Sequence, residues 1–108
     1  MHFSKKEQEE SGVYKIHLFT YGQQESKVAF YSTNLTFEEN LKDFLLSDRK
    51  IGKLSHETLM NYTLIFRQEG EFIDLKNDIP ETVIQYLLKD EPLIYLIRED
   101  KVNLLMNL

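Results

Sequence analysis

The side chains most able to do chemistry in this sequence are three widely separated histidines, His2, His17 and His56. No two of them have the helical His-Glu-x-x-His spacing that places two imidazoles on one metal ion. The chain has no cysteine, so disulfides and cysteine-ligated zinc sites are excluded. We therefore interpret the histidines as ordinary polar side chains and predict no metal site.

Two adjacent carboxylate pairs, Glu38/Glu39 and Glu99/Asp100, are the other groups suited to acid–base work. A helix start explains the first pair and a strand end explains the second. The four glycines are scattered singly, so no phosphate-binding loop is present, and no Ser-His-acid set follows from the spacing. The sequence therefore predicts a protein that is not an enzyme and that uses no cofactor.

Length and composition limit the class of protein. A chain of 108 residues with 42% hydrophobic content is typical of one domain with its own core. The net charge of −5 argues against nucleic acid as a partner, because phosphate binding needs a basic surface. The longest apolar run, Pro92–Ile97, is too short to span a bilayer, and Met1–Gly12 lacks the apolar core of a signal peptide. Together with the absence of cysteine, these features predict a cytoplasmic protein.

Two alternating segments near the start predict a β-hairpin. Val13–Tyr21 and Ser26–Thr33 each alternate with a period of two, and a short polar loop with a glycine joins them. The first segment is predicted to bury Tyr14, Ile16 and Leu18. The second is predicted to bury Val28 and Phe30, which leaves Lys27, Ala29 and Tyr31 on its outer face.

The period then changes to that of a helix. Thr36 and Glu39 form a capping box, in which the hydroxyl and the carboxylate each satisfy a backbone N–H at the helix start. Arg49 and Lys50 suit a helix C-terminus, and Gly52 is placed to end it. The predicted buried stripe of this helix consists of Phe37, Leu41, Phe44 and Leu45.

The second half of the chain predicts three more strands and a short helix. Lys53–Asn61 is a connection with room for one helical turn, followed by strands at Tyr62–Gln68 and Glu71–Leu75. Asp78 and Pro80 suit the cap and first turn of a helix. That helix has an apolar side of Val83, Ile84, Leu87 and Leu88. The last strand, Leu93–Arg98, is apolar on both faces, which is typical of a central strand.

The order of these elements predicts an α+β fold, specifically a ubiquitin-like β-grasp roll (ββαββαβ) with a mixed sheet packed on one main helix. In this fold Leu93–Arg98 lies parallel to Val13–Tyr21 at the sheet centre. The predicted organisation is a flexible leader (1–12), the domain (13–100) and an apolar C-terminal tail (101–108). The tail either docks on the domain, mediates dimerisation or begins a further element of a longer protein, and we favour the last.

Two segments, YTLIFRQEGEFIDL (62–75) and LKDEPLIYL (88–96), resemble the Ras-association and Ras-binding-like members of the ubiquitin superfold. In those domains a hairpin after the helix leads to a short acidic segment, and a Pro-Leu pair then opens the last strand. The likeness covers most of Val13–Glu99 in element order.

This resemblance implies a partner and a mechanism. The second strand would add to the sheet of a Ras-like small GTPase, while basic side chains would meet acidic residues of that partner. An exposed Tyr31 would supply an apolar anchor. The basic residues so implied are Lys15, Lys27, Lys42, Arg49 and Lys50.

Charge is distributed unevenly along the chain. Residues 13–53 contain six basic and five acidic side chains, whereas residues 54–100 contain four basic and ten acidic ones. The predicted hairpin and helix are therefore nearly neutral, which is a weak field for steering an acidic partner. The same lysines equally suit a solubilised edge strand.

Two other functions remain open. The domain could be a docking or oligomerisation module of a scaffold or cytoskeletal protein that self-associates through the edge strand or the C-terminal tail. It could also mimic ubiquitin, although Lys15, His17 and Lys27 on the predicted sheet face interrupt the apolar patch that this role needs.

Overall fold

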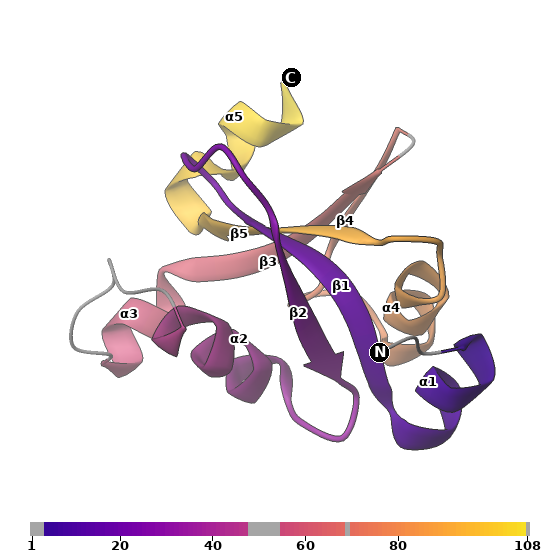
Figure 1. The fold of residues 1–108 in the computed structure, drawn as a ribbon. Helices are drawn as coiled ribbons and strands as arrows, with labels where there is room; N and C mark the ends of the chain where they lie inside the picture. Colours follow the sequence, from indigo (N-terminus) through magenta and orange to yellow (C-terminus); the bar gives the residue numbers. More distant parts are fainter. Residues whose placement is uncertain (1–3, 48–54, 69, 108) are drawn as a thin grey trace.

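Five strands form one mixed sheet in the computed structural model, which describes residues 4–47, 55–68 and 70–107 (Figure 1). The strands lie in the order β2-β1-β5-β3-β4. They are β1 (Val13–Thr20), β2 (Lys27–Ser32), β3 (Tyr62–Gln68), β4 (Glu71–Asp74) and β5 (Leu93–Arg98). β1 pairs antiparallel with β2 and parallel with β5, and β3 pairs antiparallel with both β5 and β4. The predicted α+β class and the parallel pair at the sheet centre are confirmed.

One face of the sheet carries the main core, and two helices cover it. They are α2 (Phe37–Leu46) and α4 (Pro80–Leu87). Each aliphatic side chain fully buried in this core contributes about 1.5–3 kcal/mol. The core residues on the strands and helices include Tyr14, Ile16, Leu18, Leu41, Phe44, Leu45, Leu64, Phe66, Val83, Leu87, Ile94 and Leu96.

The observed ends of α2 and α4 agree only in part with those predicted from the sequence. The predicted capping box is present, because Glu39 N donates to Thr36 Oγ1 at 3.1 Å and Thr36 N donates to Glu39 Oε1 at 3.0 Å. α2 ends at Leu46, earlier than predicted, and the predicted terminating residues 49–52 lie outside the described residues. The prediction that Asp78 caps α4 is wrong: the N-cap is Ile79, which provides no side-chain hydrogen bond, and Pro80 opens the helix.

A short helix forms within the segment predicted as a flexible leader. This helix, α1 (Lys5–Ser11), has no apolar side chain, so periodicity could not reveal it. Its start is capped by Ser4, whose Oγ accepts from Glu7 N at 3.1 Å, and its end by Gly12 in the left-handed region (φ 72°). The helix attaches to the sheet through Gln8, whose buried Oε1 accepts from Lys15 N at 2.9 Å.

The C-terminal residues pack on the opposite face of the sheet from α2. There, α5 (Val102–Met106) inserts Leu105 against Ile65 and Ile97, which corresponds to the docking alternative for the tail. Tyr21, the residue after β1, also packs in this second cluster, so α5 lies near one end of β1 and α1 near the other (Figure 1). The remaining short helices are α3 (His56–Met60), which is the helical turn expected in the connection, and η1 (Glu99–Lys101).

The docking of α5 can be tested by a pair of substitutions in adjacent residues. Leu105 is fully buried and Leu104 is half exposed. We expect Leu105→Ala to lower the free energy of unfolding by about 2–4 kcal/mol, because it removes buried methyl groups and leaves a cavity. Leu104→Ala should change it by less than about 0.5 kcal/mol. Urea denaturation measures both values, and equal effects would contradict the docked position of α5.

Candidate functional site

The pairing of β1 with β2 decides which side chains the hairpin exposes. Ile16 lies opposite Ala29 and Lys15 lies opposite Phe30. Because Ile16 is in the core, Ala29 shares its side of the sheet, and Phe30 faces the other way. Val28 and Phe30 are accordingly 52% and 50% exposed. The prediction that they are buried is wrong, and we call the sheet surface on their side of β1 and β2 the open face.

Tyr31 lies on the core side, which overturns its predicted role as an exposed anchor. It is only 6% exposed, and its ring centroid is 6.5 Å from that of Phe44 on α2. Removal from water raises the pKa of the Tyr31 hydroxyl above its usual value of 10.0. Its ring therefore belongs to the core rather than to the open face.

The three predicted basic residues that the structure describes do not converge on one surface. Lys27 lies on the side of the sheet covered by α2, where its Nζ donates to Ser47 Oγ at 2.9 Å. Lys15 lies on the open face, because it is out of phase with the buried residues of β1. The sheet thus separates the two ammonium groups.

Lys42 lies on the side of α2 that faces away from β2. Asn40 on α2 and Ser47, the C-cap of that helix, both form hydrogen bonds to β2, and they are seven positions apart and so lie on the same side of the helix. Lys42 is two positions beyond Asn40, about 200° around the helix axis, and is exposed. Arg49 and Lys50 lie outside the described residues, so the structure says nothing of their place.

Asn40 is a structural residue of the site that the sequence analysis missed. Its buried side-chain amide bonds to both peptide groups of Ser32: Ser32 N donates to Asn40 Oδ1 at 2.9 Å, and Asn40 Nδ2 donates to Ser32 O at 2.8 Å. These are the bonds that a neighbouring strand would make. The available signal was a polar amide next to the apolar stripe of a helix, where a buried polar group needs specific partners.

On the open face, two polar side chains of β1 lie beside two apolar ones of β2. The pairing places Lys15 opposite Phe30 and His17 opposite Val28. In the described part of the chain, neither the Lys15 ammonium nor the His17 ring has a hydrogen-bond or ion-pair partner. Both groups are therefore available to a ligand.

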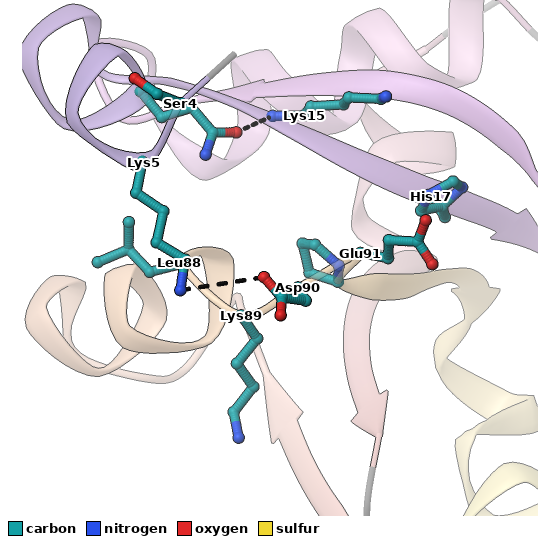
Figure 2. A pocket seen from close by; sticks show the side chains of 10 residues that line it. Ser4, Lys5, Lys15, His17, Leu88, Lys89, Asp90 and Glu91 are labelled. Carbon is teal, nitrogen blue, oxygen red and sulfur yellow. Dashed lines mark hydrogen bonds and ion pairs between the residues drawn. The ribbon is translucent and has the colours of Figure 1, made fainter. Parts of the chain in front are cut away.

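A hollow of about 550 Å³ adjoins Lys15 and His17, between α1, β1 and the turn from α4 to β5 (Figure 2). Lys5 approaches Asp90 across it, with Nζ 3.9 Å from Oδ1, and both side chains are largely exposed. Figure 2 shows the Glu91 carboxylate turned toward the His17 ring and the Lys89 side chain pointing away from Lys5. The residues that line the hollow are Ser4, Lys5, Gln8, Lys15, His17, Leu88, Lys89, Asp90, Glu91 and Pro92.

Glu91 holds an unusual backbone conformation at this hollow. Its φ is 47°, in the left-handed region that favours glycine, and it precedes a proline. Such strain costs about 1–2 kcal/mol for a residue with a Cβ atom. The described residues contain no group of three potential metal ligands and no helix long and apolar enough to cross a membrane.

Comparison with known proteins shows similarity in fold alone. No family model and no curated protein matches the sequence. Among solved structures, the Hsp90 co-chaperone Cns1 from Saccharomyces cerevisiae is similar, with a TM-score of 0.57 and 16% sequence identity. The match covers 88% of this chain and 34% of that one, so this chain spans about a third of its length.

The role of Asn40 can be tested by removing its amide. Asn40→Ala leaves the peptide groups of Ser32 without their partner, and we expect the free energy of unfolding to fall by about 1–3 kcal/mol. Lys42→Ala, an exposed substitution on the same helix, should change it by less than about 0.5 kcal/mol. Thermal and urea unfolding of both variants provide the comparison, and a neutral Asn40→Ala would contradict the role.

Proposed function

We propose that the chain is a non-catalytic protein-interaction module with a β-grasp fold. The sheet order β2-β1-β5-β3-β4, with β1 and β5 parallel at its centre and α2 between the two hairpins in sequence, supports this fold. The partner is another protein, and a docking or oligomerisation role in a scaffold or cytoskeletal assembly is one form of this function.

The observation that carries the proposal is the exposure of two large apolar side chains on one face of an edge strand. Val28 and Phe30 are two residues apart on β2 and lie on the same side of the sheet, and each is about half exposed. Exposed apolar side chains that lie together, with polar groups around them, are typical of protein-binding surfaces. A partner that covered both would gain free energy in proportion to the apolar area removed from water.

Site-specific photocrosslinking tests the docking surface even while the partner is unidentified. The photoreactive residue benzoylphenylalanine replaces Val28 in the full chain, expressed in its native cells. Met60, similarly exposed but on α3, provides the control position. We expect discrete adducts from position 28 that are lost when Phe30→Ser is added, and no such adducts from position 60. Identical adduct patterns at the two positions, or none at position 28, would contradict the proposal.

A Ras-association-like domain is the second candidate, and the position of β2 at the edge of the sheet supports it. Edge addition to a GTPase sheet would use the peptide groups that β2 turns away from β1. Lys27 is the predicted basic residue on β2 itself, although its ammonium already bonds Ser47. The buried Tyr31 provides no anchor for this mode.

A panel of small GTPases, each loaded with GDP or with a non-hydrolysable GTP analogue, tests this candidate by calorimetry. We expect a Ras-association-like domain to bind one member in its GTP form with micromolar affinity. Lys27→Glu should weaken this binding at least tenfold, because it reverses a charge on the edge strand. Lys42→Glu, which points elsewhere, should leave it within twofold. Equal binding of the two nucleotide forms, or no binding, would exclude the candidate.

A further inference from the structure

We infer that a groove between the first turns of α2 and α4 binds an arginine side chain presented by a partner protein, with its guanidinium at Asp78 and Tyr31. This groove lies on the helix-covered side of the sheet, opposite the open face. It is therefore a second binding site, beyond the surface of the proposed function.

The groove has a volume of about 270 Å³ and lies where the end of β2, the start of α2, the segment after β4 and the start of α4 meet. Its walls are mostly apolar, with Leu35 and Phe37 from the α2 side and Val83 and Ile84 from α4. Pockets that hold whole small molecules are usually larger, about 300–1,000 Å³. The groove therefore suits a single inserted side chain.

The hydroxyl of Tyr31 is an unpartnered polar group in this groove. Tyr31 is only 6% exposed, and its ring packs against Phe44. Its hydroxyl has no hydrogen-bond partner among the described residues, although it is not sealed off from solvent. Because Tyr31 lines the groove, the hydroxyl opens into it. Polar groups this far removed from bulk water normally have a partner, so the hydroxyl points to a ligand with a polar group at the same depth.

Asp78 supplies an uncompensated negative charge to the lining of the groove. Its partly exposed carboxylate has no hydrogen bond or ion pair to the described residues. Lys76 is the basic residue among those that line the groove, and its Nζ lies 3.2 Å from Glu99 Oε1. The charge of Lys76 is therefore already balanced, and that of Asp78 is not.

The helix starts beside the groove add to this negative charge. Glu38 and Glu39 lie in the first turn of α2, and Glu81 lies in the first turn of α4. Together with Asp78 they make four carboxylates. The two helix N-termini, each equivalent to about +0.5 of an elementary charge, offset only about one of them. The surroundings of the groove therefore favour a cation.

An arginine side chain satisfies both the apolar walls and the two polar groups. Its aliphatic stem can pack along the walls while its charged head stays near the rim. Its guanidinium has five N–H donors, enough for the Asp78 carboxylate and the Tyr31 oxygen together. An aliphatic side chain would leave both oxygens without a partner, and a carboxylate would be repelled by Asp78.

Selection from a phage library of random dodecapeptides on the full chain is the first step of the test. We expect the selected peptides to share an arginine. A synthetic peptide of the selected sequence is then titrated by fluorescence polarisation, beside a copy in which norleucine replaces that arginine. Norleucine keeps the aliphatic stem and removes the charge, so we expect it to weaken binding at least tenfold.

Two isosteric substitutions in the protein locate the binding site. Asp78→Asn should weaken binding of the arginine peptide at least tenfold, and Tyr31→Phe should weaken it about three- to tenfold, because it removes one oxygen and keeps the ring. The matched controls are Asp43→Asn, at an exposed position on α2 outside the groove, and Tyr95→Phe, on the other side of the sheet. Each control should change binding by less than twofold.

Four results would overturn the inference: no selected peptides, selected peptides without a shared arginine, equal binding of the norleucine peptide, or equal effects of Asp78→Asn and Asp43→Asn. Circular dichroism verifies that each variant is folded, and Tyr31→Phe decides the question if Asp78→Asn disturbs the start of α4. Photocrosslinking at position 28 concerns the open face alone, so the two sites stand or fall separately.

Discussion

The pairing of β1 with its two neighbours is the constraint on which the rest of the structure depends. β1 pairs antiparallel with β2 and parallel with β5, and its buried side chains, Tyr14, Ile16 and Leu18, fix which way each neighbour must face. Side chains alternate along a strand, so a shift of one residue would exchange the two faces of β2 completely. The observed register leaves Val28 and Phe30 about half exposed on the same face as Lys15 and His17, and it places Tyr31 beneath α2. The surface offered to a partner is thus a consequence of how the core is filled.

A second constraint comes from α2, which stabilises the hairpin it packs against. Exposed strand edges invite unwanted pairing, and proteins protect them in several ways. Here Asn40 takes the position of a neighbouring strand at Ser32, and Ser47 holds Lys27 at the other end of β2. These contacts leave the face of the hairpin exposed while they restrict its edge. Because part of the edge of β2 is already bonded, this hairpin is poorly suited to pairing with a long added strand. A partner is therefore expected to contact the open face of the hairpin.

The sequence predicted the elements whose pattern is local. β3 and β5 have the predicted bounds, and the capping box that begins α2 is present, because alternation and capping depend on residues close together in the chain. The orientation of β2 could not be predicted, since both of its faces carry apolar residues and only the pairing with β1 chooses between them. α1 was missed because it has no apolar stripe, and the hydrogen bond that ties it to β1, from Lys15 N to Gln8 Oε1, leaves no periodic pattern in the sequence. Lys15, Lys27 and Lys42 do not converge, because the side of the sheet or helix on which each lies depends on strand register and helix rotation, which the local pattern does not give.

The nuclear Overhauser pattern between β1 and β2 tests this register most directly. Because both peptide groups of Ser32 point away from β1, Lys15 and Phe30 form a pair without direct hydrogen bonds, with Cα atoms about 4.5 Å apart. The structure therefore predicts a strong cross-peak between the Hα protons of Lys15 and Phe30, and another between those of His17 and Val28. A strong Hα cross-peak between Lys15 and Tyr31 would instead turn Val28 and Phe30 toward α2, and it would contradict the open face as the docking surface.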